Sequence, residues 1–386
     1  MADAVTVLDI GSRWIKAGWA YNQPTDGEPR ILAPSAVYVD PSGPGADPGV
    51  STSSAPGELQ HPIRRGRIVS WDQFESLAYY VLYELMGWEL GNEGNIMICE
   101  PVLTGRSDRE TMAQLMFEVF NVTGIFCQDQ AVLSLYAVGR TNGLVVDLGH
   151  DKIDVATVAE GMLIPSSVRR LDFGGANLTQ YLQRLLQDPQ RAQPQPDGAG
   201  GLHPTQPLSD DDAEALKALC ARCAETRAGF TSAVESAAAE TFRLPDGQEF
   251  TVAAEGLRVG EALFQPYELL GVRGPNIAEA ACDSAACLHD ALLRKVMFEN
   301  MLVVGGGSVI PGVTQRFLSE ARSLVPAAAN AALTPIPEYM PSPNVTRDAA
   351  WVGGSVLAKV ALLQNHFIVK AEYDEAGPGA VHRRCA

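Results

Sequence analysis

Two short motifs place an aspartate and a glycine at the end of an apolar run. Asp9 and Gly11 follow an apolar stretch that begins at residue 5, and Asp147 and Gly149 follow a similar stretch that begins at residue 143. A second apolar run comes after each motif, so both are typical of strand–turn–strand hairpins. An aspartate at such a position places a carboxylate at the tip of the hairpin, and the glycine lets the backbone come close to another group. The repeat therefore predicts two hairpins whose tips can carry chemistry.

A third glycine turn strengthens this interpretation. Gly305 and Gly306 follow the apolar run 301–304 and precede residues 313–324, which have the pattern of a helix. Loops of this composition are common, so a single turn of this kind would be weak evidence. Two hairpins together with a strand–glycine–helix turn predict a two-lobed nucleotide cleft.

The remaining elements must position these turns. Helical patterns cover residues 71–85, 107–120, 131–138, 178–186, 211–228 and 353–363. Ser107 with Glu110 fits a capping box at the start of the second of these helices. Residues 40–60 and 187–210 are rich in Pro and Gly with Ser or Gln, so we expect a flexible loop and a disordered insertion there. The predicted fold class is α/β.

The composition of the chain limits the classes of partner that it can bind. The chain has 386 residues, 46% of them hydrophobic, and a formal net charge of −17. So acidic a surface repels nucleic-acid phosphates and anionic lipid, which predicts no direct nucleic-acid contact and favours basic protein segments as partners. No apolar run reaches the length of a membrane helix, and residues 1–4 do not resemble a signal peptide. Seven cysteines, an odd number, suggest a reducing compartment.

Four blocks carry a resemblance to a known family. They are residues 130–141, 261–266, 351–358 and 372–385, and they occur in the same order as in actin. The chain therefore resembles the actin family along nearly its whole length. A finer similarity, in residues 87–96, 244–248 and 338–341, is to the plant actin-related protein 7 class.

The resemblance implies a two-lobed actin-like ATPase fold, of the ASKHA, ribonuclease H-like kind, with four subdomains. By that resemblance, subdomain 1 comprises residues 1–32, 70–138 and 347–386, and subdomain 2 comprises residues 33–69. Subdomain 3 comprises residues 139–175 and 263–346, and subdomain 4 comprises residues 176–262 with the insertion near 187–210.

The resemblance also implies a site for ATP and Mg²⁺. Its cofactor-binding residues would be Asp9, Gly11, Ser12, Lys16, Asp147, Gly149, Gly305, Gly306 and Arg347. Asp9 and Asp147 would hold Mg²⁺ through water, Arg347 would lie near the adenine, and Gln130 would orient the attacking water.

Several positions depart from the family pattern. Arg13 replaces a glycine of the first loop, where a side chain restricts the backbone and crowds a phosphate or, alternatively, adds a positive charge. His150, Asp151 and Asp154 stand where actin has Asp, Gly and His, and Lys217 stands where it has a ribose-contacting Glu. These departures disfavour efficient hydrolysis, and they leave nucleotide occupancy open.

The implied role is a non-catalytic subunit of a nuclear SWI/SNF-type chromatin-remodelling complex, with the cytoplasm as a second location. The implied partners are an HSA-type helix of the remodelling ATPase and a neighbouring actin or actin-related protein. One alternative is an ATP-hydrolysing cytoskeletal actin relative. Another is a sugar kinase or Hsp70-type chaperone, which the actin-like residues 372–385 disfavour. Residues 40–60 and 267–277 depart from actin's filament contacts, so we expect no conventional filament.

The cysteines give two further expectations. Cys220 and Cys223 form a C-x-x-C without a second ligand pair, so we expect two small apolar residues on one face of a helix rather than a metal site. The same holds for Cys282 and Cys287. By resemblance to actin, Cys385 is expected to be exposed and reactive.

Overall fold

The computed structural model describes residues 5–20, 28–39, 58–187, 208–245, 247–326, 329–338 and 344–385. Most of the predicted loop at 40–60 and of the predicted insertion at 187–210 therefore lies outside the described residues. The chain forms two compact units. Unit 1 contains Met1–Val145, Ala156–Val168 and Thr334–Ala386, and unit 2 contains Val146–Val155 and Arg169–Leu333. The boundaries of the four subdomains stay a prediction.

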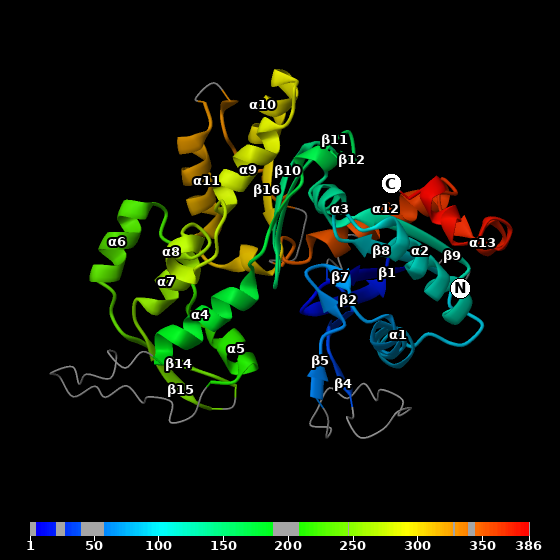
Figure 1. Cartoon of the computed structure of the whole chain (residues 1–386), viewed down its shortest axis with the longest axis horizontal. Helices are drawn as coiled ribbons and strands as arrows, with labels where there is room; N and C mark the ends of the chain where they lie inside the picture. Colours follow the sequence, from blue (N-terminus) through cyan, green and yellow to red (C-terminus); the bar gives the residue numbers. More distant parts are fainter. Residues whose placement is uncertain are drawn as a thin grey trace. The chain divides into compact units, whose positions relative to one another are not determined.

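Unit 1 is built on a six-stranded sheet (Figure 1). Its order is β17 (Ile368–Val369), β9 (Gly124–Asp129), β8 (Asn95–Glu100), β1 (Val5–Ile10), β2 (Trp14–Trp19) and β3 (Ile31–Pro34). The three central strands, β9, β8 and β1, are parallel, and every residue in them is buried. Parallel strands of this kind need cover on both faces, which explains their continuous apolar runs.

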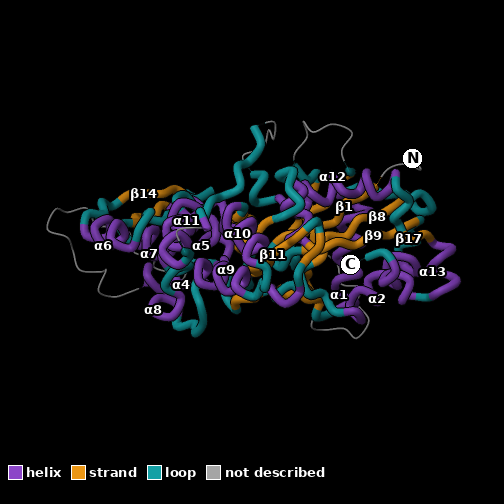
Figure 2. The backbone as a smooth tube through the Cα atoms, turned by 90° about the horizontal axis from the view of Figure 1, so that it is seen from above, coloured by secondary structure: helices purple, strands orange, loops and turns teal. Residues whose placement is uncertain are grey.

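Helices cover this sheet. They are α1 (Trp71–Tyr79), α2 (Arg106–Gln114), α3 (Gln130–Ala137), α12 (Ala349–Leu363) and α13 (Lys370–Ala376), followed by the 3₁₀ helix η8 (Pro378–Arg383). Seen from above, α12 crosses one side of the sheet while α1 and α2 lie on the other (Figure 2). A β-carbon on Gly353 of α12 would overlap the carbonyl oxygen of Leu133 on α3, so these two helices are in backbone contact.

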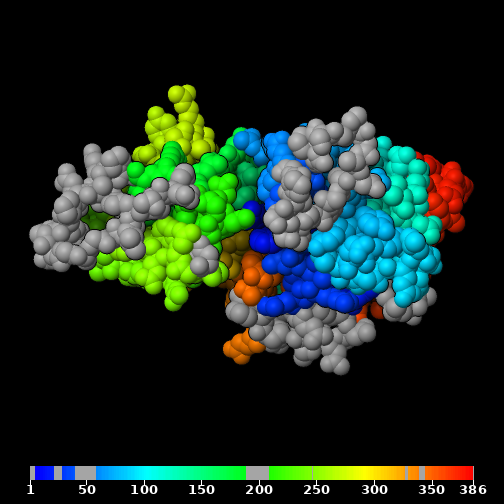
Figure 3. Space-filling view, turned by 90° about the horizontal axis from the view of Figure 1, so that it is seen from below, coloured from blue at the N-terminus to red at the C-terminus, as the bar shows by residue number. Residues whose placement is uncertain are grey.

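Short elements complete unit 1. The strand pairs are β4 (Val37–Val39) with β5 (Glu58–Gln60), and β6 (Ile63–Arg64) with β7 (Arg67–Ile68). From below, the dark blue surface of the first strands adjoins the lighter blue surface of the segment around α1 (Figure 3). Both α1 and α2 continue as single π-helical stretches, Tyr80–Leu85 and Leu115–Val119.

A second sheet has the order β12 (Met162–Leu163), β11 (Ile153–Ala159), β10 (Gly143–Leu148) and β16 (Met301–Val304), with β13 (Arg169–Leu171) also paired to β11. Unit 2 adds the hairpin β14 (Glu240–Arg243) with β15 (Glu249–Val252). Its helices are α4 (Gly175–Gln187), α5 (Asp210–Cys220), α6 (Arg227–Glu235), α7 (Glu255–Glu261), α8 (Pro266–Leu270), α9 (Ile277–Ala286), α10 (Ala291–Glu299) and α11 (Val313–Leu324). Among the described residues, no helix combines the length and the apolar character that crossing a membrane requires.

Two local predictions were wrong. The predicted helix at 211–228 is interrupted, because α5 ends at Cys220 and α6 begins only at Arg227. Segment 220–223 instead runs beneath three glycines: a β-carbon on Gly256, Gly260 or Gly312 would overlap one of its carbonyl oxygens. The predicted capping box is absent too, since α2 begins at Arg106 with Gly105 as its N-cap.

Candidate functional site

In the first hairpin, the positive charge of a lysine is paired with two carboxylates. Asp9 of β1 lies opposite Lys16 of β2 in the strand register. The Lys16 ammonium is 3.3 Å from the Asp9 carboxylate and 3.3 Å from that of Asp348, and it donates to the carbonyl of Arg347 at 3.0 Å. The cation expected to neutralise a phosphate is thus already held by two carboxylates of unit 1. The side chain of Arg347 in turn donates to Asp348 at 2.7 Å.

Gln130 fastens this hairpin to α3. Its amide nitrogen donates to Asp9 Oδ1 at 2.7 Å and to the carbonyl of Ile10 at 3.2 Å. These bonds hold the aspartate at the tip of β1 and fix the first residue of α3 beside it. In unit 1 the observed contacts of Gln130 are therefore those of a positioning residue.

The first loop accommodates its unexpected arginine. A β-carbon on Gly11 would be 2.7 Å from the carbonyl oxygen of Trp14, so this turn needs glycine at that point. The hydroxyl of Ser12 accepts from the Gly66 N–H at 3.5 Å. The guanidinium of Arg13 lies 5.5 Å from the ring centroid of Trp14, and Arg13 is not among the described residues with a positive φ. The substitution is thus tolerated without backbone strain.

The second hairpin repeats the geometry of the first. A β-carbon on Gly149 would be 2.7 Å from the carbonyl oxygen of Lys152, as on Gly11 in the first turn. Gly305 has φ 86°, and a β-carbon there would overlap the carboxylate of Asp147. Gly306 faces open space. The structure therefore brings the second hairpin and the third glycine turn together within unit 2, as the sequence predicts.

Asp154, which stands where the resemblance places a histidine, is buried and belongs to an ion triad with Lys152 and Arg170. Its carboxylate accepts from Arg170 at 2.6 and 2.9 Å and pairs closely with Lys152. Burial opposes ionisation of Asp154, but the two cations outweigh that effect and lower its pKa. A carboxylate held charged in this way does not exchange protons with substrate water near neutral pH.

Lys217 is likewise committed to neighbours within unit 2. Its ammonium donates to the Gly175 carbonyl at 2.9 Å, the Thr179 hydroxyl at 2.9 Å and the Glu214 carboxylate at 2.8 Å. Burial raises the pKa of Glu214, but Lys217 outweighs it, so the pKa is lowered overall. Lys217 therefore joins α5 to the start of α4.

The start of α4 also holds the second loop. The N–H of Gly175 donates to the Gly149 carbonyl at 2.9 Å, and the N–H of Ala176 donates to the His150 carbonyl at 2.6 Å. These first-turn N–H groups would otherwise be available to an anion. In this structure they bind the hairpin backbone instead.

Sequence reasoning missed the partners of these residues. They are Asp348 beside Lys16, Lys152 and Arg170 beside Asp154, and Glu214 beside Lys217. Two signals were available, because Lys152 is two residues from Asp154, and Glu214 and Lys217 are three residues apart on one helix. Asp348 and Arg170 come from other elements and leave no local trace.

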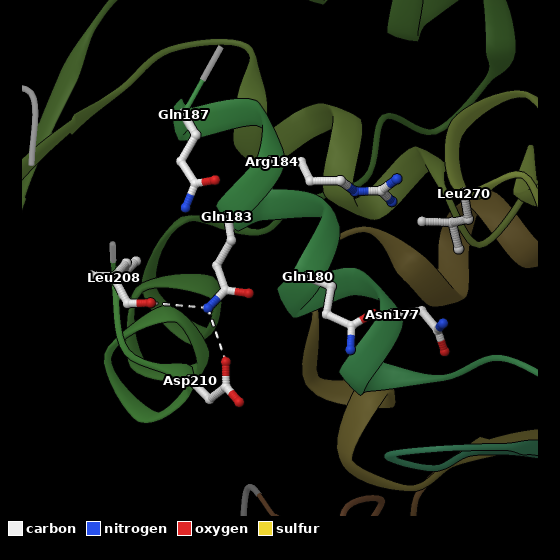
Figure 4. Close-up of a pocket in the computed structure, with 8 residues that line it drawn as sticks. All are labelled: Asn177, Gln180, Gln183, Arg184, Gln187, Leu208, Asp210 and Leu270. Atoms are coloured by element: carbon white, nitrogen blue, oxygen red, sulfur yellow. Dashed lines mark hydrogen bonds between the residues drawn. The ribbon is translucent and has the colours of Figure 1, made fainter. Parts of the chain in front are cut away.

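A surface cavity of about 580 Å³ lies along α4 (Figure 4). Its lining residues are Asn177, Gln180, Gln183, Arg184, Gln187, Leu208, Asp210 and Leu270. The amide nitrogen of Gln183 spans to α5, donating to the Leu208 carbonyl at 3.1 Å and to Asp210 at 3.0 Å. None of the predicted nucleotide-binding residues lines this cavity, so it is separate from the candidate nucleotide site.

The cysteines correct two expectations. Cys220 and Cys223 are both buried, but Cys223 lies beyond the end of α5, so the prediction that they share one face of a helix was wrong. Cys385 is buried, with 5% of its surface exposed, so the prediction of an exposed thiol was wrong. Within the described ranges, no cluster of three His, Cys, Asp or Glu side chains could hold a metal ion.

Comparison with known proteins decides the family. The family model described as Actin matches residues 2–386. The chain belongs to the actin family. It is 40% identical to actin-related protein 7 of Arabidopsis thaliana over 381 residues, covering 98% of this chain and 99% of that protein. It is 38% identical to actin-related protein 7 of Oryza sativa subsp. indica, covering 98% and 99%, and 30% identical to human actin-like protein 7B, covering 98% and 88%.

The α/β, actin-like fold predicted for this actin-related protein is thereby confirmed. The assignment of individual residues to nucleotide and Mg²⁺ binding stays a prediction. These residues are divided between the two units. Asp9, Gly11, Ser12, Lys16, Gln130 and Arg347 belong to unit 1, and Asp147, Gly149, Gly305 and Gly306 belong to unit 2.

Proposed function

We propose that this actin-related protein is a non-catalytic subunit of a nuclear SWI/SNF-type chromatin-remodelling complex, docked on a helical segment of the remodelling ATPase. The observation that carries the non-catalytic part is the Asp154–Lys152–Arg170 triad. It replaces a histidine of the family pattern with a carboxylate whose pKa is lowered by Lys152 and Arg170. The fastened Lys16 and Lys217 support the same conclusion.

ATP with Mg²⁺ is the ligand that membership of the actin family indicates. Gly11 and Gly149 keep the two turns tight, and Gly306 leaves open space, so backbone N–H groups at these turns fit a phosphate. Asp9 and Asp147 would hold the metal through water and supply its charge compensation. We propose that a bound nucleotide stabilises the fold and is not hydrolysed.

Turnover is directly measurable. Phosphate release from ATP and Mg²⁺ is expected to be equally slow for the wild-type chain and for Gln130→Ala, because the Gln130 amide nitrogen is engaged with Asp9 and Ile10 and positions the hairpin. A wild-type rate about tenfold or more above that of Gln130→Ala would contradict the proposal and favour the ATP-hydrolysing cytoskeletal relative.

The proposed docking surface lies on α12 in unit 1, beside α3. Val356, Val360 and Leu363 are four and three residues apart, so they share one face of the helix. They are 48%, 43% and 84% exposed, respectively. An amphipathic helix can lay its apolar face on such a stripe. The net charge of −17 favours a helix whose polar face is basic, as the proposed ATPase segment requires.

A binding measurement tests the docking. A basic amphipathic peptide from the HSA-type segment of a remodelling ATPase, labelled for fluorescence anisotropy, is expected to bind with and without ATP. Val360→Asp should weaken binding about tenfold or more, because it places a charge on the apolar stripe. Leu292→Asp on α10 is the matched control, since Leu292 is 75% exposed and belongs to unit 2. Equal binding by wild type and Val360→Asp would refute this surface.

The remaining partner proposals follow from the same complex. A neighbouring actin or actin-related protein completes it, and DNA contacts are left to other subunits because of the acidic charge. The absence of a conventional filament stays a prediction, since residues 40–57 lie outside the described residues.

A further inference from the structure

Two cysteines far apart in the sequence lie against each other in unit 1. Cys127 is a fully buried residue of β9, and Cys385 follows Arg384, the C-cap of η8. The backbone N–H of Cys127 donates to the Cys385 sulfur at 3.2 Å. Neither cysteine is in a disulfide. The nucleotide site and the α12 surface make no use of this pair.

Several bonds hold Cys385 in this place. Its N–H donates to the Val381 carbonyl at 3.0 Å, and its carbonyl accepts from the Arg109 guanidinium at 3.4 Å. Arg109 is fixed in turn by a 2.7 Å ion pair with the buried Glu100. The chain end accordingly lies beside β9 and α2 (Figure 2). The sulfur is therefore positioned by a built environment rather than by a loose loop.

The other contacts of the same segment lie closer to the surface. His382 pairs with Glu110 at 2.9 Å, and Arg384 donates to the carbonyls of Asn365 and Phe367 at 2.7 and 3.0 Å. Glu110 and Arg384 are both well exposed, with 43% and 36% of their side chains accessible, so these contacts are readily exchanged for water. Local opening of residues 378–385 thus requires much less than unfolding of unit 1.

The geometry suits a covalent bond between the two sulfurs. With the Cys385 sulfur 3.2 Å from the Cys127 nitrogen, standard bond lengths place it within about 5 Å of the Cys127 Cα. Disulfides join Cα atoms about 4.4–6.8 Å apart, so the bond requires rotation of the Cys127 and Cys385 side chains together with a shift of residues 378–385. A hydrogen bond with Cys385 and burial raise the pKa of the Cys127 thiol, which keeps it protonated while the segment is closed.

We propose that Cys127 and Cys385 form a redox modification site, whose two thiols join in a reversible disulfide that fastens residues 378–385 to β9. The oxidant is a low-molecular-weight disulfide such as glutathione disulfide. In a reducing compartment the bond forms only under oxidative load and is removed by thiol exchange.

The exchange takes two steps. When residues 378–385 open, the Cys385 thiolate attacks one sulfur of glutathione disulfide, forms a mixed disulfide and releases one glutathione thiolate, which takes up a proton. Cys127 then loses its proton to water, and its thiolate attacks the Cys385 sulfur and releases the second glutathione. Two protein thiols are oxidised, and one glutathione disulfide is reduced to two glutathione molecules.

The full reduced chain tests the proposal. It is equilibrated with glutathione buffers of increasing oxidised fraction, quenched with an alkylating reagent, and digested without reduction for mass spectrometry. The expected product is one cross-linked peptide pair containing Cys127 and Cys385, lighter by two hydrogens than the separate peptides. Amide hydrogen exchange in residues 378–385 should slow about tenfold or more in the oxidised chain and recover on reduction.

Matched variants separate this site from general oxidation. Cys127→Ser and Cys385→Ser should each abolish the cross-link. Cys385→Ser also removes the thiolate that attacks glutathione disulfide in the first step. Cys282→Ser, a half-exposed cysteine of unit 2, should leave the cross-link unchanged. Glutathione on Cys385 without a Cys127 cross-link, or a pairing of Cys385 with any other cysteine, would overturn the proposal. Because the peptide map uses the wild-type chain, its result does not depend on the variants folding.

Discussion

Replacing Glu261 with glutamine is expected to lower the free energy of unfolding by about 3–5 kcal/mol. Glu261 and Arg316 are 0% and 1% exposed, and the guanidinium donates to the carboxylate at 2.7 and 2.8 Å. The neutral amide cannot compensate the buried charge of Arg316, for which only the half-buried Glu320 at 2.9 Å would then remain as an ion-pair partner among the described residues. Removing one partner of a buried pair leaves an uncompensated charge in a low-dielectric environment.

Urea unfolding followed by circular dichroism measures this loss. The double variant Glu261→Gln/Arg316→Met should be more stable than Glu261→Gln alone, because it removes the stranded charge. Glu240→Gln is the matched control, since it breaks an ion pair with Arg222 at 3.0 Å that is 36% and 49% exposed and should cost less than about 1 kcal/mol. Equal losses for Glu261→Gln and Glu240→Gln would contradict the expectation.

Gly353→Ala is expected to destabilise unit 1 by about 3 kcal/mol. Alanine normally favours a helix over glycine by about 1 kcal/mol, so propensity alone predicts the opposite sign. The β-carbon would overlap the carbonyl oxygen of Leu133, which is backbone and cannot rotate away. The clash forces α12 away from α3 and loosens the contact at which the two helices meet.

Urea unfolding also measures whether Gly353→Ala lowers or raises the free energy of unfolding. Gly379→Ala is the control, because a β-carbon there meets nothing within 4 Å, and the change should be within about 0.5 kcal/mol of wild type. Binding of the ATPase peptide should also weaken in Gly353→Ala, since Val356 and Val360 move with α12. A stabilised Gly353→Ala would show that the helices separate without cost.

The hairpins could be predicted because their determinants are local. Asp9 with Gly11 and Asp147 with Gly149 each mark a turn between two apolar runs, and the structure gives both turns the same tight geometry. The long helices α11 and α12 could be predicted for a similar reason, because each has a local helical pattern. The pattern in residues 313–324 gave both ends of α11 correctly.

Other features were hidden because distant residues decide them. Residues 221–226 contain no proline or glycine, so local propensity predicted that the helix would continue, and the glycines of α7 and the α11 start override it. The burial of Cys385 depends on Arg109 and β9, which no nearby residue reveals. Arg170 beside Asp154 and Asp348 beside Lys16 were missed likewise, although they determine what the candidate site can do.

The passage of segment 220–223 beneath three glycines brings the backbones of α5, α7 and α11 into contact. Its carbonyls lie directly against Gly256 and Gly260 of α7 and against Gly312 at the start of α11, with no side chain between them. No one of α5, α7 and α11 can open without uncovering the backbone of another. Their amides should therefore share a single free energy of exchange, so that this part of unit 2 behaves as one cooperative block.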